Sequence, residues 1–187
     1  MTIGIGGISR SGKSTLAALI HRFFTVEVRN PDSFGKGGQT ATILAQDDYI
    51  FPTEQIPKIQ NGEAIEIDWE TPESIDFQRY RKAILDAQKQ FDHVITEGLL
   101  NFYAEDINSL FNKFIFVDIS KTTFLSRKAA DKRWGEVPNW YIEHIWVSYE
   151  RLGRTILSDK KKEVLVLSGE VDFDKTLIID FLKKSSN

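Results

Sequence analysis

The feature that most constrains this chain of 187 residues is the segment 7–14, which reads Gly-Ile-Ser-Arg-Ser-Gly-Lys-Ser. It matches the phosphate-binding pattern G-x-x-x-x-G-K-[ST] at every fixed position. Such a loop needs a strand before it and a helix after it, because curled backbone N–H groups and a helix N-terminus together hold the phosphate oxygens. The flanking sequence predicts both, a strand at 2–6 and a helix from about 13 to 24. The chain is therefore predicted to have an α/β fold that binds nucleotide.

The rest of the chain alternates short apolar runs with longer segments of helical period, which is typical of a parallel sheet covered by helices on both faces. Further strands are predicted at 41–45, 92–96, 113–117 and 163–167, and further helices at 73–89, 121–132, 139–157 and 174–183. The segments 29–39 and 52–72 lack periodicity and are predicted to be irregular. These elements predict a single domain over 1–187, with a five-stranded parallel sheet and a small helical lid at about 121–140.

Composition excludes several classes of function. The chain carries 24 Lys plus Arg against 27 Asp plus Glu, and a net charge of −3 gives no electrostatic basis for binding nucleic acid or an anionic membrane. It has no cysteine, which excludes thiolate catalysis and suits a reducing compartment. No apolar run approaches the roughly 18 residues that span a bilayer, and the N-terminus does not read as a signal peptide. We expect a cytoplasmic protein without nucleic-acid or membrane partners, and the sequence leaves its oligomeric state open.

The residue types of the phosphate loop assign its roles. Contacts to ATP are predicted from the loop and the start of its helix, namely Gly7, Ile8, Ser9, Arg10, Ser11, Gly12, Lys13, Ser14 and Thr15. Lys13 is expected to reach the β- and γ-phosphates, and the Ser14 hydroxyl to bind Mg²⁺. Binding of nucleotide without turnover stays as an alternative.

Acidic residues follow three of the predicted strands, at the edge where open α/β sheets bind ligands. They are Asp47 with Asp48, Glu97, and Asp118. A kinase of this class needs carboxylates to hold Mg²⁺ and to accept the proton of the attacking hydroxyl. Asp47 and Glu97 are the candidates for these roles, with helix capping or a solvated loop end as the alternative interpretations. Asp118 is predicted to be structural.

A basic cluster lies in the predicted lid and consists of Arg127, Lys128, Lys132 and Arg133. Such a cluster is often only a solvated helix face. Beside a phosphate loop it can also close over the triphosphate and neutralise charge that develops during transfer. Both interpretations stay open.

The aromatic residues divide into two groups. Trp146 and Tyr149 have helical spacing and are predicted to belong to the core, whereas Trp69 and Trp134 lie in irregular or turn-like segments, where a large aromatic favours a binding role. The three histidines, at 21, 93 and 144, show no metal-ligand spacing and receive no site role.

Several segments together resemble the nucleoside kinases related to uridine kinase, and in particular their nicotinamide riboside branch. The matching segments are the phosphate loop, Gln46-Asp47-Asp48-Tyr49, Trp69-Glu70-Thr71-Pro72-Glu73, Thr96-Glu97-Gly98-Leu99-Leu100, Leu125-Ser126-Arg127-Lys128 and His144-Ile145-Trp146-Val147-Ser148-Tyr149. The phosphate loop alone would indicate only a superfamily. The Gln-Asp-Asp and Trp-Glu-x-Pro-Glu segments are more specific, and His-x-Trp-x-x-Tyr points to the nicotinamide riboside branch.

The resemblance implies a P-loop kinase fold with ATP and Mg²⁺ as co-substrate and cofactor. Asp47 matches the catalytic carboxylate of the family and Glu97 its second acidic residue, so the implied metal site comprises Ser14, Asp47 and Glu97. Trp69 and Trp134 fall where that branch holds the two faces of the nicotinamide ring. Glu70 falls where the family usually has an Asp that binds the ribose 2′- and 3′-hydroxyls.

The chain departs from the family pattern in three places. Glu70 is one methylene longer than the usual Asp. The lid arginine that helps to hold the ribose falls at Ala129, which leaves Lys128 or Arg133 as substitutes. The loop at 29–39 is longer than usual.

The leading hypothesis is transfer of the ATP γ-phosphoryl group to a nucleoside 5′-hydroxyl, with Lys13, Asp47 and Glu97 as catalytic residues and nicotinamide riboside as the favoured acceptor. Uridine or cytidine is the alternative acceptor, and other small metabolites are more distant ones. A nucleotide-binding regulatory module is the non-enzyme alternative. A GTPase would require Asn-Lys-x-Asp, but Asn112-Lys113 is followed by Phe114-Ile115, so that motif is absent.

Overall fold

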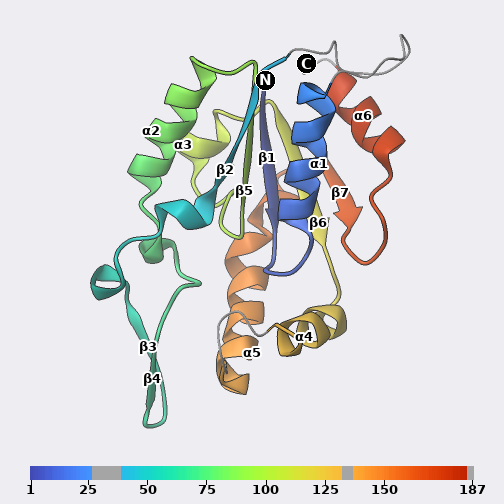
Figure 1. Cartoon of the computed structure of the whole chain (residues 1–187). Helices are drawn as coiled ribbons and strands as arrows, with labels where there is room; N and C mark the ends of the chain where they lie inside the picture. The colour runs from blue at the N-terminus through green and yellow to red at the C-terminus, as the bar shows by residue number, and fades with distance from the viewer. Residues whose placement is uncertain (27–38, 132–136, 185–187) are drawn as a thin grey trace.

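The computed structural model describes residues 1–26, 39–131 and 137–184. Its centre is a five-stranded sheet in the order β2-β5-β1-β6-β7 (Figure 1). The strands are β1 (Thr2–Gly7), β2 (Ala41–Ala45), β5 (His93–Gly98), β6 (Lys113–Asp118) and β7 (Val164–Ser168), and every pairing between them is parallel. The predicted five-stranded parallel sheet is confirmed.

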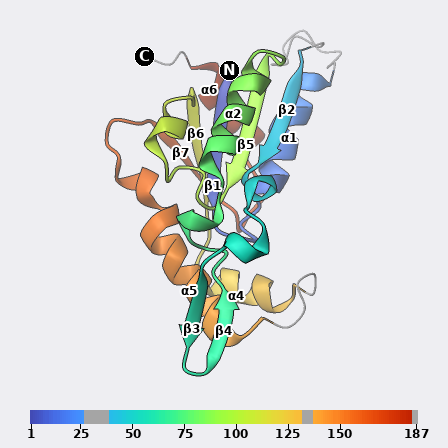
Figure 2. The ribbon, with the colours of Figure 1, turned by 90° about the vertical axis from the view of Figure 1, so that its left-hand side faces the viewer.

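Helices cover both faces of this sheet (Figures 1 and 2). On one face lie α1 (Lys13–Thr25) and α6 (Lys175–Lys183), and on the other lie α2 (Phe77–Gln88) and the short α3 (Glu105–Asn108). α4 (Lys121–Ala129) and α5 (Asn139–Ser148) lie beyond the carboxyl ends of the strands, the edge at the bottom of Figure 1. None of the helices in the described ranges has the length and apolar run needed to cross a bilayer.

The sheet separates two apolar cores, because its inner strands are apolar on both faces. Ile3, Ile5 and Ile115 pack against α1 and α6, whereas Phe114 and Phe116 pack against α2, α5 and the segments between them. Trp146 is 7% exposed and Tyr149 is fully buried, so their predicted place in the core is confirmed.

The excursion at 52–72 was predicted to be irregular, and this was wrong for part of it. Strands β3 (Lys58–Asn61) and β4 (Ala64–Ile67) form an antiparallel hairpin that projects from the body (Figure 1). Gly62 turns the hairpin with φ +62°, a left-handed conformation that suits glycine. Most of its side chains are exposed, and a strand without a buried face leaves no clear alternation in the sequence.

The helix predicted over 139–157 is also shorter than expected. α5 ends at Ser148, and a wider helical turn (Tyr149–Gly153) and a 3₁₀ turn (Thr155–Ser158) follow it. The Tyr149 hydroxyl donates to Asp118 Oδ1 at 2.6 Å, and Arg154 Nη1 donates to the same oxygen at 2.9 Å. These two bonds draw the segment toward the end of β6, and they give Asp118 the structural role expected of it.

The start of α2 shows how local polar groups set a helix boundary. Pro72–Ser74 forms a 3₁₀ turn, and the Asp76 side chain then accepts a hydrogen bond from the Arg79 N–H at 2.9 Å. This is an N-cap, which satisfies a donor that the helix cannot satisfy itself. α2 therefore begins at Phe77 and not at the predicted residue 73.

Candidate functional site

The phosphate loop links β1 to α1 and turns back on itself at three residues. Gly7, Arg10 and Gly12 have φ of 154°, 65° and 101°, and Arg10 is the one non-glycine residue with positive φ in the part of the chain that the structure describes. The Ser11 N–H donates to Ile8 O at 3.1 Å, which closes the turn. Lys13 is the first residue of α1, so the partial positive charge of the helix N-terminus lies at the loop.

Two side chains of the loop converge on Glu97, the penultimate residue of β5. Ser14 Oγ donates to Glu97 Oε1 at 2.8 Å, and Lys13 Nζ lies 3.6 Å from Glu97 Oε2. Glu97 is only 8% exposed. A buried carboxylate needs such partners, because burial without them strongly disfavours its charge.

Asp47 lies beside this group in a 3₁₀ turn (Gln46–Tyr49) that follows β2. Ala45 pairs with Glu97 across the sheet, so Asp47 and Glu97 leave the same edge on neighbouring strands. Gln46 anchors the turn, since it is buried and its Oε1 accepts the Leu100 N–H at 3.0 Å. Asp47 itself is exposed, which leaves its carboxylate accessible to a ligand.

Glu70 lies in the excursion after β4, close enough to the phosphate loop for the charge of Lys13 to act on it. Burial raises the pKa of its carboxyl to about 7, and the nearby charges of Asp47 and Asp68 act in the same direction. Lys128 and Lys13 oppose this shift and favour the ionised form of Glu70. Charges from the turn after β2, the excursion, α1 and α4 thus act on one carboxyl group.

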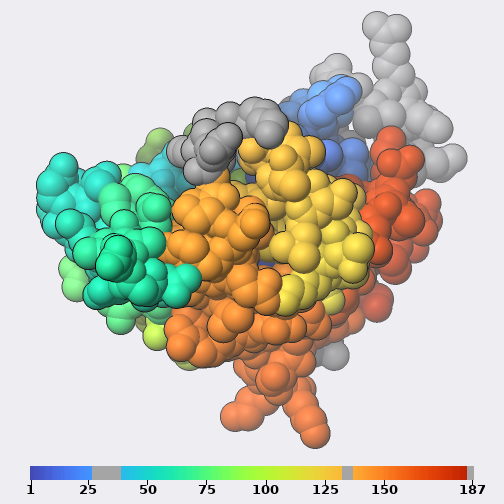
Figure 3. Space-filling view, turned by 90° about the horizontal axis from the view of Figure 1, so that it is seen from below, coloured from blue at the N-terminus to red at the C-terminus, as the bar shows by residue number. Residues whose placement is uncertain are grey.

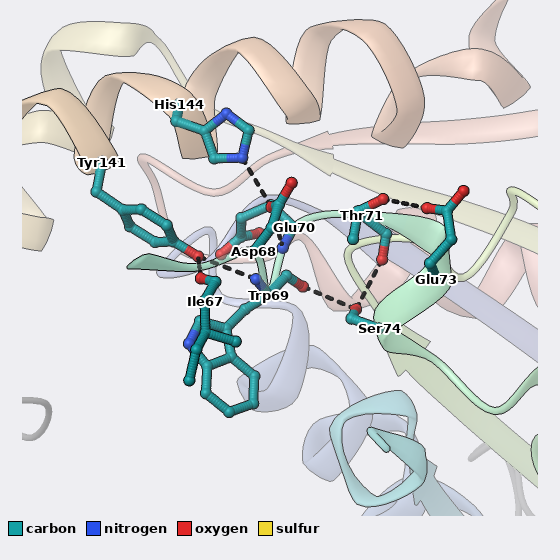
Figure 4. Close-up of polar contacts among 9 residues, drawn as sticks. All are labelled: Ile67, Asp68, Trp69, Glu70, Thr71, Glu73, Ser74, Tyr141 and His144. Atoms are coloured by element: carbon teal, nitrogen blue, oxygen red, sulfur yellow. Dashed lines mark hydrogen bonds and ion pairs between the residues drawn. The ribbon is translucent and has the colours of Figure 1, made fainter. Parts of the chain in front are cut away.

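The neighbouring Trp69 is 39% exposed, a large fraction for an indole ring. Its backbone is nevertheless held, because Ser74 Oγ donates to Trp69 O at 3.0 Å and to Thr71 O at 2.7 Å (Figure 4). Ser74 is fully buried, so these bonds are shielded from water. The segment therefore presents an aromatic face on a fixed backbone.

Arg127 links α4 to the phosphate loop. Its guanidinium donates to Arg10 O at 3.0 Å and to Gly169 O at 2.8 Å, while Arg10 Nε lies 3.8 Å from Asp131 Oδ2. The sequence left open whether the basic cluster is only a solvated helix face. Arg127 does not fit that interpretation, because its guanidinium is bonded to the phosphate loop and to Gly169. Trp134, Lys132 and Arg133 lie outside the described residues, as do residues 29–38 of the long loop.

Four residues near the site had no role in the sequence analysis. Asp68, Tyr141 and His144 join the segment after β4 to α5 (Figure 4), over separations of 72–76 positions. No local pattern signals contacts between residues so far apart. The fourth is Gly169, which follows β7.

Gly169 lies against the phosphate loop more closely than any side chain would allow. A Cβ atom there would lie 2.0 Å from the Ser11 backbone oxygen and 2.9 Å from Val117 Cγ1. Neither the loop backbone nor a buried strand residue can shift to make room without a cost in free energy.

We expect Gly169→Ala to lower kcat/KM for ATP by up to about 10²-fold, since small displacements of positioning groups carry losses of that size. Steady-state kinetics with varied ATP measures it. Gly62→Ala is the matched control, because nothing lies within 4 Å of its added Cβ, although its φ of +62° is strained for alanine. Equal ATP kinetics in both variants would contradict the assigned role of Gly169.

Comparison with known proteins gives relatives at low identity. Human nicotinamide riboside kinase 1 is 21% identical over 183 residues, covering 89% of this chain and 83% of its own. Uridine-cytidine kinase 2-B of Danio rerio is 24% identical over 199 residues, covering 89% of this chain and 72% of its own. No family model matches the chain.

Among solved structures, a sugar kinase from Janibacter sp. HTCC2649 superposes with a TM-score of 0.58 at 16% identity, over 97% of this chain and 93% of its own. That likeness concerns the fold alone. Together with the curated relatives, it confirms the predicted resemblance to P-loop nucleoside kinases.

Proposed function

We propose that this chain is an ATP-dependent kinase that phosphorylates the 5′-hydroxyl of a nucleoside, with nicotinamide riboside as the favoured acceptor. The observation that carries the proposal is the convergence of Lys13 and Ser14 on Glu97, with Asp47 on the neighbouring strand end. A phosphate loop supplies the nucleotide site, and an accessible carboxylate beside it supplies a base.

In the proposed reaction, the acceptor hydroxyl oxygen forms a bond to the γ-phosphorus while the bond from that phosphorus to the β,γ-bridging oxygen breaks. The proton of the hydroxyl passes to Asp47, and ADP leaves with the bridging oxygen. Lys13 holds the β- and γ-phosphates, and Arg127 and Lys128 bring positive charge from α4. Positioning and charge neutralisation do most of the work in such a transfer.

The proposed cofactor is Mg²⁺, and the residues present fit it. Ser14 Oγ and a Glu97 oxygen lie 2.8 Å apart, and Asp47 is close by, so the donors are hydroxyl and carboxylate oxygens. Among the described residues no group of three or more His, Asp or Glu side chains is placed to hold a metal by itself. Nucleotide-bound Mg²⁺ needs only one or two protein carboxylates, since phosphate oxygens and water complete its shell.

Trp69 and Glu70 support a nucleoside as the acceptor. The indole ring is exposed enough to stack on a planar base, and the half-buried Glu70, which follows Trp69 directly, is our candidate to bind the ribose hydroxyls. An aromatic face such as that of Trp69 attracts a cation. The residues before and after Trp69 in the chain, Asp68 and Glu70, both carry carboxyl groups. A nicotinamide ring linked to ribose is cationic and a uracil ring is neutral, which favours nicotinamide riboside.

The test is competition among nicotinamide riboside, uridine and 2′-deoxyuridine at equal concentrations with ATP and Mg²⁺, read as phosphorylated products by mass spectrometry. We expect nicotinamide riboside to react first and 2′-deoxyuridine last, because a 2′-deoxy acceptor leaves a Glu70 oxygen unpaired. Trp69→Ala should raise the nucleoside KM about 5- to 150-fold, by analogy with base stacking, and Trp69→Phe should restore most of it.

Other outcomes would reassign the chain. Preference for uridine would move it to the pyrimidine nucleosides. Binding of ATP without ADP release in the presence of any acceptor would make it a nucleotide-binding regulatory module.

A further inference from the structure

Two side chains of α5 reach the segment that follows the β3–β4 hairpin (Figure 4). The Tyr141 hydroxyl donates to Ile67 O at 2.8 Å and accepts the Trp69 N–H at 3.0 Å. His144 Nε2 lies 2.8 Å from Asp68 Oδ1. A carboxylate only accepts hydrogen bonds, so this ring nitrogen carries the hydrogen.

Asp68 extends the contact to Glu70. The same Oδ1 atom accepts the Glu70 backbone N–H at 3.2 Å. The Trp69 N–H is shared between Tyr141 and Ile67 O, which lies 3.2 Å away. α5 thus holds the backbone of both residues that we assign to the acceptor, Trp69 through Tyr141 and Glu70 through Asp68.

The α5 side of this contact is rigid and shielded. Tyr141 is 6% exposed and belongs to the core that packs under α5. Burial, followed by the charge of Glu70, raises the pKa of the Tyr141 hydroxyl above its usual value, so it keeps the hydrogen that it donates to Ile67. The side chains of His144 and Asp68 are each 17% exposed.

The views along two further directions agree with this arrangement. In Figure 2 the hairpin lies in front of α4 and α5, and the view from below shows the segment that contains it adjoining α5 (Figure 3). Beyond its contacts with α5, the hairpin projects away from the sheet (Figure 1). Its base therefore depends on α5 for its position relative to the phosphate loop.

We propose that Tyr141 and His144 are positioning residues, which fix Trp69 and Glu70 at the distance from the phosphate loop that the acceptor nucleoside needs. This inference rests on the proposed function. The pair acts through backbone and through Asp68, and neither residue touches the reacting atoms. We call the four residues Asp68, Trp69, Tyr141 and His144 the α5 clasp.

The two α5 side chains of the clasp, Tyr141 and His144, set the position of the segment and not its local shape. Ser74 already fixes the local fold of the segment through its bonds to Trp69 O and Thr71 O, and these bonds do not involve α5. Loss of the clasp therefore leaves the segment folded but free to shift as a unit. The expected consequence is weaker nucleoside binding with an unchanged ATP site.

The clasp itself is tested without substrate by amide hydrogen exchange at Trp69. Tyr141→Phe removes one of the two acceptors of the Trp69 N–H and leaves the longer bond to Ile67 O, so it should speed exchange about 3- to 10-fold. Tyr149→Phe is the matched control, since it removes a hydroxyl that is hydrogen-bonded to Asp118 at 2.6 Å and not to this segment. Unchanged exchange in Tyr141→Phe would overturn the clasp, whatever the substrate of the enzyme.

Kinetics tests the positioning role. Tyr141→Phe and His144→Leu should each raise the nucleoside KM about 3- to 10-fold, with kcat and the KM for ATP unchanged within about twofold. His144→Gln retains an N–H donor and should restore the wild-type KM. His21→Leu, on α1, is the control for loss of a histidine and should change neither KM.

The route through Asp68 gives the sharpest test. In an Asp68→Ala background, His144→Leu should have no further effect on the nucleoside KM, because coupled residues are not additive. If the effects of Asp68→Ala and His144→Leu on the nucleoside KM were fully additive, the route through Asp68 would be wrong. If neither Tyr141→Phe nor His144→Leu changed the nucleoside KM, the positioning role would be wrong and the clasp would be a purely structural contact. Failure of the wild type to phosphorylate any nucleoside would instead contradict the proposed function, and the exchange experiment would still report on the clasp.

Discussion

Lys13→Ala is expected to leave a folded protein that turns over about 10²–10³ times more slowly than the wild type, the loss typical of removing one preorganised group that stabilises developing charge. Lys13 lies at the start of α1, with Nζ 3.6 Å from Glu97 Oε2. In the proposed reaction its charge faces the phosphate oxygens on which negative charge accumulates. ADP release at saturating nucleoside and ATP measures the loss.

The fold should survive this substitution, because Glu97 retains its hydrogen bond from Ser14 at 2.8 Å. Circular dichroism and thermal melting check this point. Lys82→Ala is the matched control, since the Lys82 side chain is 79% exposed on α2 and its removal changes the net charge equally. Wild-type turnover in Lys13→Ala would exclude the phosphate loop from the reaction.

Asp47→Asn should lower kcat by about 10²–10⁴-fold, because an amide of nearly the same shape cannot accept the hydroxyl proton. The affinity for ATP should change little, since the phosphate loop and α1 are untouched. Single-turnover measurements with pre-bound ATP separate the chemical step from binding.

Asp48→Asn is the control for Asp47→Asn. Asp48 is the next residue of the same 3₁₀ turn and is equally exposed, and its backbone oxygen accepts a hydrogen bond from Arg79. The side-chain change leaves that bond intact, so kcat should stay near the wild-type value. If Asp48→Asn lost activity and Asp47→Asn did not, the general base would be the second carboxylate of the pair.

The parts of the molecule that the sequence predicts well are those determined by neighbours in the chain. β1, the phosphate loop and α1 follow from one continuous segment, and the apolar run of β6 follows from burial on both faces. The hairpin escaped prediction because its strands are mostly exposed. The helix predicted at 139–157 is longer than α5. The chain leaves the helix after Ser148 because Tyr149 and Arg154 bind Asp118, and no helical period in the sequence reveals that contact.

The candidate site divides in the same way. Lys13 and Ser14 follow from a motif, and Asp47 and Glu97 follow from their places at strand ends. Trp69 follows from the place of a large aromatic residue in an irregular segment, whereas Glu70 came only from resemblance to a family. Gly169 and the α5 clasp could not be predicted, because they depend on contacts between distant segments, such as the approach of Gly169 to Ser11.

The pairing of Glu97 with Lys13 and Ser14 has a consequence for how nucleotide enters and leaves. Inward-facing N–H groups, a helix N-terminus and a lysine concentrate positive charge at the loop. Glu97 balances part of that charge from within the protein, through its contacts with Lys13 and Ser14. Under the proposed function, an incoming triphosphate replaces Glu97 as the counter-ion of Lys13, and the lost ion pair offsets part of the attraction between Lys13 and the triphosphate. Under the proposed function, re-formation of the Lys13–Glu97 pair offsets part of the free energy that is lost when ADP leaves.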